Sequence, residues 1–467
     1  MEETLKSTLE TSDDIQYELY IKGLSEDNVR AISADLQEPE RMLQLRLESL
    51  QKRYDMPYPS RWPDLQGIRE QIESDSLVFY ARPKKWFQWY SRKREEVDPK
   101  IKAKFEKLGI PEAEKAYLAG AGWQYDSEVV YHNIKERWAK VGVIFEDMSQ
   151  ALLKHEDLVK KYFMKLIPNK DHKFMALHGA VWSWGTFIYV PKGISVTEPL
   201  QAYFRMNTFA GGQFEHTLII IEDEATGDYI EGCSAPKFDA KSLHAWCVEV
   251  YVWKNAKMRY SSVENRSTNT YNLNTKRAVI DDHGFMEWIN GNLGSCTTML
   301  YPCSILKGDY AKSDQIGVVV AGAGQNQDSW SKVIHIGKHT SSTIVSKSIS
   351  KDGGISTYRG IVDIMAWAEG AVNATECDAL LMDDHSISTT IPYINVSRDD
   401  ATIAHEASAG KVDETQLFYM MSRGLDEQKA MWMIVNGFIS PVIKKLPLEY
   451  AAELNRLIEM EMEGSVG

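Results

Sequence analysis

The chain lacks the short cysteine spacings from which most small metal sites are built. No two of its five cysteines are separated by only two residues, which excludes a closed zinc knuckle and a CxxC redox motif. The five are Cys233, Cys247, Cys296, Cys303 and Cys377. Their odd number and the acidic start at Met1 to Glu10 are unlike an exported protein and predict reduced thiols in the cytosol. Any group bound by these cysteines must be held by residues distant in sequence.

Three other absences argue against whole classes of function. The longest apolar runs, such as Leu218 to Ile221, are far shorter than the roughly 20 residues that span a bilayer. A formal charge of −13 argues against a general binder of nucleic acids or anionic membranes. There is no GxxxxGK[ST] phosphate loop, and Gly322 to Gln327 lacks the last glycine and the following helix of a dinucleotide motif. If ATP drives this system, another subunit must bind it.

The chain divides into three regions by its hydrophobic pattern. Residues 1–136 are charged and mostly helical, with a helix expected at Pro39 to Tyr54. Residues 137–405 contain a long series of short strands separated by turn signals such as Asp352-Gly353-Gly354. Their even spacing fits a stacked solenoid or a large sandwich. Residues 406–467 are helical again, and Gly437 is expected to end one of these helices.

Cys377 is the cysteine with the clearest chemical context. The pair His405-Glu406 follows it where the strand pattern is expected to stop and helices to begin. A thiolate, an imidazole and a carboxylate hold iron more weakly than four thiolates, which suits a cluster that must be handed on. On the residues alone, a strand cysteine and a glutamate at a helix start are more often structural. Both interpretations stay open at this point.

Cys233 lies where a strand runs into a turn. It would be a reactive thiolate if a cation lay close by, and Arg205 or Lys276 are the candidates for that charge. The alternative is an inert cysteine buried as a small apolar residue. The remaining three, Cys247, Cys296 and Cys303, lie among strand residues and are expected in the core.

Two Asp-Asp-His triplets, at 281–283 and 383–385, keep a rival function open. Each resembles a metal-ligand cluster but falls between strands, where aspartate commonly forms turns. Paired carboxylates on a β-helix would suit a glycan-active or glycan-binding protein. That rival predicts export and an aromatic-lined groove, against which the acidic start and the reduced cysteines argue.

An ordered set of sequence blocks resembles the SufB branch of the SufB/SufD family, which assembles iron–sulfur clusters in the SUF system. The similarity runs from about Trp138 to Glu449. Its most specific blocks are FIYVPKG (187–193), PLQAYFRMN (199–207), YIEGCSAP (229–236), NTKRA (274–278), VIHIGKH (333–339), ECDAL (376–380), HEA (405–407) and QLFYMMSRG (416–424). The sister branch, SufD, shares the fold but lacks the cysteine–glutamate pair.

The resemblance implies a mainly β fold, a right-handed parallel β-helix between helical domains, that forms a dimer with a second SufB copy or with SufD. It implies a cytoplasmic scaffold, not an enzyme by itself, on which a transient iron–sulfur cluster forms from persulfide sulfur supplied by a cysteine desulfurase system. A SufC-type ABC ATPase is expected on the C-terminal helices, where we place Met431 and Met433. Whether a reduced flavin takes part is left open.

The resemblance also assigns roles to single residues. Cys377 and Glu406 coincide with the family's cluster ligands, His405 with the histidine beside them, and Cys233 with the sulfur acceptor. Polar positions that line the family's sulfur path coincide with Arg205, Asn207 and Lys276. Better-known members have a glutamine and a tryptophan where this chain has Glu264 and Arg266, so the polarity of the path is expected to differ here.

Overall fold

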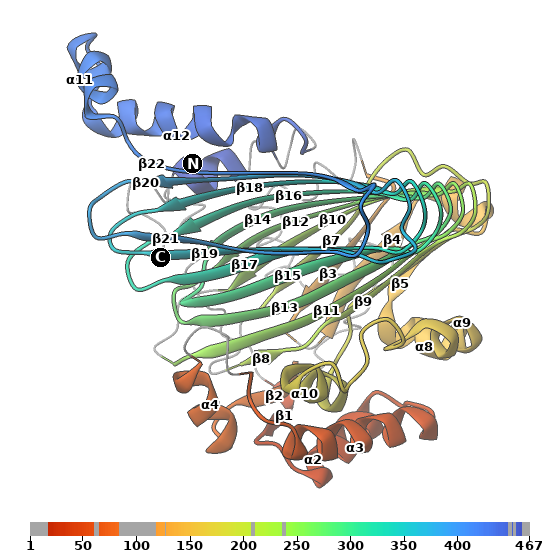
Figure 1. The fold of residues 1–467 in the computed structure, drawn as a ribbon. Coiled ribbons are helices and arrows are strands. Elements are labelled where there is room, and N and C mark those ends of the chain that lie inside the picture. Colours follow the sequence, from red (N-terminus) through yellow and green to blue (C-terminus); the bar gives the residue numbers. More distant parts are fainter. Residues whose placement is uncertain are drawn as a thin grey trace.

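The computed structural model is built around a flattened parallel β-solenoid of about seven turns (Figure 1). It describes residues 17–59, 65–83, 118–126, 128–206, 211–235, 240–446, 451 and 454–459. Successive turns contribute one strand to each of two long sheets, named sheet I and sheet II here. In spatial order, sheet I consists of β4 (Glu128–Ile134), β3 (Gly120–Tyr125), β7 (Leu200–Arg205), β10 (Thr226–Ala235), β12 (Lys257–Arg266), β14 (Phe285–Gly294), β16 (Lys312–Ala321), β18 (Ser341–Ser350), β20 (Val372–Leu381) and β22 (Thr402–Lys411). Sheet II consists of β5 (Ile144–Asp147), β6 (Thr186–Val190), β9 (His216–Ile221), β11 (Ser242–Val252), β13 (Thr270–Ile280), β15 (Thr297–Leu306), β17 (Asn326–His335), β19 (Ile355–Ile364) and β21 (Ile387–Val396), with β8 (Gly212–Gln213) beside β11.

This arrangement confirms the predicted mainly β fold and decides for the solenoid over the sandwich. Corner residues in the left-handed region, with φ between 54° and 59°, recur from turn to turn at Asn255, His283, Tyr310 and His339. The rings of the last three stack, with centroids 4.9 and 5.0 Å apart. Both Asp-Asp-His triplets lie in turns; Asp383, for example, accepts the backbone N–H groups of residues 385 and 386. Turn formation therefore accounts for these triplets.

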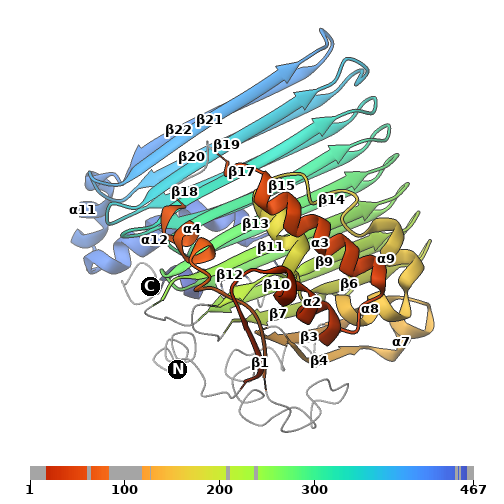
Figure 2. The same cartoon turned by 90° about the horizontal axis from the view of Figure 1, so that it is seen from below.

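Helices cover the outer faces of the two sheets at different places (Figures 1 and 2). No helix among the described residues is both long and apolar enough to cross a bilayer. The elements outside the solenoid are the hairpin β1 (Tyr17–Lys22) and β2 (Val78–Pro83), and the helices α2 (Glu26–Asp35), α3 (Glu40–Asp55), α4 (Gln66–Glu73), α7 (Glu136–Lys140), α8 (Met148–Lys154), α9 (Glu156–Tyr162), α10 (Lys173–Val181), α11 (Glu414–Ser422) and α12 (Glu427–Ile443). The N-terminal helices and α8 to α10 lie over the early strands of sheet II and leave β19 and β21 uncovered (Figure 2). Helix α12 packs its apolar side on the outer face of sheet I.

Two predicted boundaries are wrong. Helix α12 does not end at Gly437 but continues to Ile443, because Val435, Ile439 and Val442 pack against sheet I and offset the roughly 1 kcal/mol cost of a helical glycine. Glu406 does not begin a helix. It lies within β22, which pairs with β20 along its whole length to Lys411, so strands extend beyond residue 405.

Candidate functional site

Cys377 lies in the interior of the solenoid, close to its last turn. Side chains along β20 alternate between exposed and buried, and Cys377 is on the buried side with 2% of its surface exposed. Its Sγ lies 3.6 Å from Thr390 Oγ1 of β21. Burial raises the pKa of this thiol above its ordinary value, although the contact with Thr390 opposes the rise. The thiolate form therefore needs a metal ion or another cation beside it.

His405 enters the same interior from the neighbouring strand, and Glu406 does not. His405 pairs in register with Thr375, two residues before Cys377, and its Cε1 would lie 3.6 Å from a Cβ added to Gly360 across the interior. Its Nε2 is buried and has no hydrogen-bond partner among the described residues. Glu406 pairs with an outward-facing strand residue and is exposed. The structure thus places a thiol and an imidazole on the same interior face, offset by two residues in register, and leaves the carboxylate on the opposite face.

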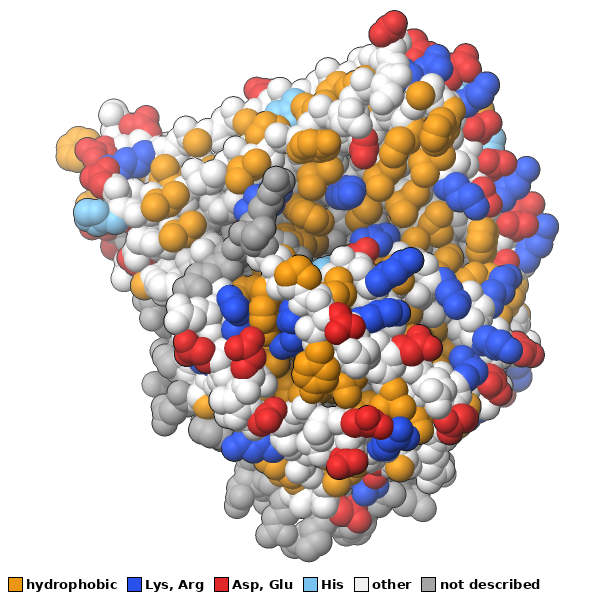
Figure 3. All heavy atoms as spheres, turned by 60° about the horizontal axis from the view of Figure 1, so that its bottom comes forward, with side chains coloured by type: hydrophobic (Ala, Val, Ile, Leu, Met, Phe, Trp, Pro, Cys, Tyr) orange, Lys and Arg blue, Asp and Glu red, His pale blue; other side chains and the backbone are white. Residues whose placement is uncertain are grey.

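The last turn is open at the end of the solenoid. Strands β21 and β22 each have one neighbour in their sheets, and their free edges are ten residues long. Apolar side chains are exposed on β21, with exposed fractions of 49% for Ile387, 41% for Ile391 and 58% for Tyr393. Figure 3 shows hydrophobic side chains gathered on the part of the surface that the charged helices leave uncovered. Exposed edges of this kind are typical of strands that pair with another chain.

Cys233 also faces the interior, five strands away in sheet I. It belongs to the same hydrophobic core as Cys377 and is 2% exposed. The strand order β10-β12-β14-β16-β18-β20 contains five steps of about 4.8 Å, so the two cysteines are about 24 Å apart along the axis. Cys247 and Cys303 belong to strands of sheet II, and all five cysteines are free thiols.

The cation that acts on Cys233 is Arg266, which sequence reasoning did not assign to this role. Burial raises the pKa of the Cys233 thiol well above its ordinary value, and the charge of Arg266 is the main effect that opposes the rise. Arg266 is 1% exposed; its Nη1 lies 3.3 Å from Gln213 Oε1, while Nε and Nη2 have no hydrogen-bond partner among the described residues. Two unused donors on a buried guanidinium beside a thiol favour binding of an anion.

The two residues expected to supply that charge are placed elsewhere. Arg205 follows Phe204, whose ring contacts the interior Trp246, so alternation along β7 directs Arg205 to the outer face. Lys276 is inside the solenoid, but its Nζ lies 3.5 Å from Glu264 Oε1 and within hydrogen-bond distance of two other polar groups. Burial acts to raise the pKa of Glu264, but the charge of Lys276 opposes this effect, and the pKa of Glu264 is below its ordinary value. Lys276 and Glu264 therefore form a buried ion pair inside the solenoid.

A line of small and polar side chains connects the two cysteine regions. Register pairing along the inner face of sheet I joins one residue from each strand between β10 and β20. The residues in this line, called the polar ladder, are Glu231, Ser262, Asn290, Gly317, Ser346 and Cys377. Lys276 donates to both Ser262 Oγ, at 2.9 Å, and Asn290 Oδ1, at 3.2 Å. The ladder begins two residues from Cys233 on the same strand and ends at Cys377.

A small cavity of about 20 Å³ borders the middle of the polar ladder. Its lining includes Asn290, Gly317, Ser346 and Tyr358. A Cβ added to Gly317 would meet no atom within 4 Å, so the absence of a side chain at this position leaves open space. The sequence alone did not reveal this feature, because the ladder depends on strand register. Among the described residues, no further cysteine lies on this ladder.

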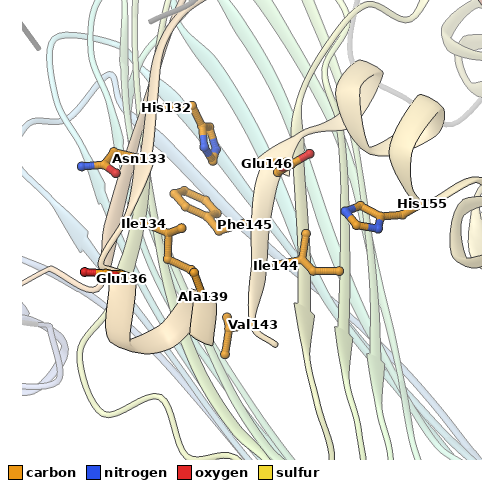
Figure 4. A pocket seen from close by; sticks show the side chains of 10 residues that line it. All are labelled: His132, Asn133, Ile134, Glu136, Ala139, Val143, Ile144, Phe145, Glu146 and His155. Atoms are coloured by element: carbon orange, nitrogen blue, oxygen red, sulfur yellow. The ribbon is translucent and has the colours of Figure 1, made fainter. Parts of the chain in front are cut away.

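Met431, Met433 and a second pocket lie outside this interior. Asn207 is outside the described residues. Met431 and Met433 lie on α12, and Met433 is 50% exposed. A separate pocket near β4, β5 and α7 is lined by His132, Phe145 and neighbouring residues (Figure 4). It contains none of the predicted site residues and belongs to the opposite end of the solenoid from Cys377.

Comparison with known proteins connects this geometry to a biological process. Residues 204–438 match the family model described as "SUF system FeS cluster assembly, SufBD core domain", and residues 124–202 match the "SufBD protein N-terminal region". The chain is 50% identical over 446 residues to the "Iron-sulfur cluster assembly protein SufB" of Bacillus subtilis, covering 96% of this chain and 94% of that protein. An "Iron-sulfur cluster assembly SufBD family protein" of Staphylococcus aureus is 50% identical over 455 residues, covering 97% and 96% of the two chains. This coverage includes much of the N-terminal region, beyond the blocks that carry the resemblance. The chain therefore belongs to the SufB/SufD family of iron–sulfur cluster assembly proteins.

Proposed function

We propose that this chain is a scaffold on which nascent iron–sulfur clusters are built from persulfide sulfur and iron and then passed on, and that it is not an enzyme by itself. The observation that carries this proposal is the polar ladder, which leads from the Cys233 region through an internal cavity to Cys377. The cluster is the cargo of this site. Cys377 and His405 are its first ligands, because both lie inside the last turn. Glu406 can join them only after β22 rearranges.

The proposed sulfur acceptor is Cys233, and Arg266 is the cation that would stabilise its thiolate. The thiolate attacks the outer sulfur of a donor persulfide, a new S–S bond forms at Cys233, and the donor leaves as a thiolate. This transfer involves no net oxidation, and both the thiolate and the product persulfide are anions that Arg266 stabilises. Release of that sulfur as sulfide needs two electrons, which a thiol or a reduced flavin could supply. A role for flavin remains a prediction that no described residue supports.

Partners fit two separate surfaces. A SufC-type ATPase would dock on α11 and α12, where Phe418 is 71%, Tyr419 56% and Met433 50% exposed. A second SufB copy or SufD would pair with the free edges of β21 and β22 at the open end. The sulfur donor would be a cysteine desulfurase system. The free thiols are consistent with the expected cytoplasmic location.

A comparison of two sulfur sources tests the proposal. Under anaerobic conditions, Cys233→Ala should fail to assemble a cluster from a persulfide donor but should still assemble one from free sulfide, because Cys377 and His405 remain. Cys377→Ala should block both routes. Cys303→Ala is the matched control, because it also removes a buried free cysteine. Normal assembly from the persulfide donor in Cys233→Ala would refute the relay, and normal assembly in Cys377→Ala would refute the cluster site. A glycan-active protein should acquire no cluster by either route.

A further inference from the structure

Three ligand-type side chains meet beneath α10, on the outer face of sheet II and away from the polar ladder. His178 of α10, His216 of β9 and Cys247 of β11 each place a ligand atom within 4.8 Å of the other two. His216 and Cys247 are register partners on adjacent parallel strands, so their side chains leave the sheet side by side. All three are at most 1% exposed. Among the described residues, this is the one such group of three.

Hydrogen bonds determine which nitrogen of each imidazole carries a proton. His178 Nδ1 lies 3.1 Å from the Ala245 carbonyl oxygen, which can only accept, so Nδ1 carries its proton. His216 Nε2 lies 3.0 Å from Glu249 Oε2 and donates to that carboxylate. Glu249 is held as an acceptor by three backbone N–H groups, those of Met164, Leu166 and Ile167, at 2.6 to 2.8 Å.

The two remaining ring nitrogens face each other. His178 Nε2 and His216 Nδ1 are 3.1 Å apart, and in the neutral rings both are acceptors whose lone pairs point into the same small space. Two acceptors at this distance need a cation between them, which is either a proton or a metal ion. The thiol of Cys247 beside them adds a soft third donor.

We propose that His178, His216 and Cys247 bind a thiophilic transition-metal ion of the Zn²⁺ type. With metal–nitrogen distances of about 2.0–2.1 Å and a metal–sulfur distance of about 2.3 Å, ligand atoms around one ion lie about 3.2–3.6 Å apart. The two nitrogens, 3.1 Å apart, are close to this spacing, and the sulfur has to approach by about 1 Å at most. Each histidine donates its other N–H to a carbonyl or a carboxylate, which is the arrangement that orients metal-bound histidines.

The charges balance with a divalent ion. The Glu249 carboxylate and a Cys247 thiolate carry two negative charges, which match the two positive charges of the ion. Binding of the ion releases the thiol proton of Cys247 and changes no oxidation state. The centroid of the Phe163 ring lies 4.0 Å from that of the His216 ring and makes the surroundings of the site apolar. A bound ion would link α10 to β9 and β11 and would therefore stabilise the fold.

The test uses the full-length chain carrying Cys233→Ala and Cys377→Ala, so that neither interior cysteine contributes and the result is independent of the proposed cluster function. Titration with Co²⁺ should give one ion per chain and a thiolate-to-cobalt charge-transfer band, and Zn²⁺ should displace the cobalt and raise the melting temperature. In this background, Cys247→Ser should abolish the band and weaken Zn²⁺ binding at least about tenfold. Cys303→Ser, which changes a buried cysteine of the same sheet, should have no effect.

His178→Gln is the second variant, since it keeps a polar side chain at the same place. It should retain the thiolate band and weaken Zn²⁺ binding at least about tenfold. Far-UV circular dichroism establishes that each variant is folded. The proposal is refuted if the background chain shows no thiolate–cobalt band, or if folded His178→Gln and Cys247→Ser bind Zn²⁺ as tightly as that chain does.

Discussion

Gly317→Leu tests whether the polar ladder is a path for sulfur or only a polar part of the core. Gly317 is the fourth member of the polar ladder and borders the internal cavity. Since an added Cβ meets nothing within 4 Å, a leucine side chain at this position would extend into that cavity between Asn290 and Ser346. The substitution removes no hydrogen-bonding group and lies two strands from Cys377. It should therefore obstruct movement along the ladder without changing either cysteine.

The expected change in stability is small compared with the expected change in rate. Replacing a strand glycine removes an entropic cost of about 0.5–1 kcal/mol, whereas overpacking costs about 1–3 kcal/mol. The free energy of unfolding should therefore change by no more than about 2.5 kcal/mol. If this cavity is the route of the sulfur, the rate of cluster formation from persulfide should fall at least about tenfold, which equals roughly 1.4 kcal/mol in the barrier.

The assay compares initial rates of cluster absorbance from a persulfide donor and from free sulfide. Gly317→Leu should slow the first rate and leave the second unchanged, because free sulfide reaches Cys377 from the open end of the solenoid. Gly317→Ala, which adds a single carbon in open space, is the matched control and should retain most of the persulfide rate. Equal persulfide rates in the leucine variant and the unmodified chain would show that sulfur does not travel this way.

Three further substitutions test other parts of the account. Arg266→Gln should slow persulfide formation at Cys233, followed by mass spectrometry, roughly ten- to a hundredfold. Arg266 is diagonally opposite Cys233 on the neighbouring strand, and a charge at the usual diagonal spacing of about 7–8 Å contributes about 2 kcal/mol at an effective dielectric constant of about 20. Arg266→Lys should restore part of the rate. Replacing Met431 and Met433 with glutamate should weaken SufC binding, measured by calorimetry, by at least about tenfold, because it desolvates unpaired charge in the interface. Arg46→Met should lower the free energy of unfolding by about 3–5 kcal/mol in chemical denaturation, because it leaves the buried Glu38 carboxylate unpaired.

Each of these predictions has a control and a contradicting result. Arg205→Gln, on the outer face, should leave the persulfide rate unchanged; if it slows the reaction as much as Arg266→Gln does, the assignment of the cation is wrong. Leu153→Glu changes an exposed apolar residue far from α12, and SufC binding weakened equally by it would remove the docking site. Arg30→Met breaks an exposed ion pair and should cost less than about 1 kcal/mol; an equal loss in both arginine variants would contradict the buried-pair argument.

The sequence pattern predicted where strands lie better than it predicted the side of a strand on which each side chain lies. The strands expected at Thr186 to Val190 and His216 to Ile221 agree with β6 and β9, because runs of β-branched and aromatic residues between turn signals mark strands locally. The face on which a side chain lies depends on register, and a shift of one residue reverses it. Arg205, which the resemblance placed on the sulfur path, lies on the outer face of sheet I, whereas Arg266 faces the interior.

The site was predicted in part for the same reason. The thiol of Cys377 and the imidazole of His405 share the interior, but adjacent residues of a strand point in opposite directions, so His405 and Glu406 cannot both face Cys377 in this arrangement. The polar ladder was not predictable from spacing, because its members are brought into line only by pairing between successive turns. The ladder's open position at Gly317 likewise has no signature in the sequence, since a strand glycine often marks only a bulge or a close approach.

The most direct test of the relay follows the sulfur itself. Cys233 is first loaded with a persulfide carrying isotopically heavy sulfur, and iron and a thiol reductant are then added anaerobically in an excess of light sulfide. Mass spectrometry of the acid-labile sulfide measures how much heavy sulfur enters the cluster at Cys377. The account predicts that the cluster contains a larger fraction of the heavy isotope than the bulk sulfide does, and that Gly317→Leu removes this enrichment. A cluster with the isotope ratio of the bulk sulfide in the unmodified chain would show that sulfur leaves Cys233 for solvent, and would contradict the internal path.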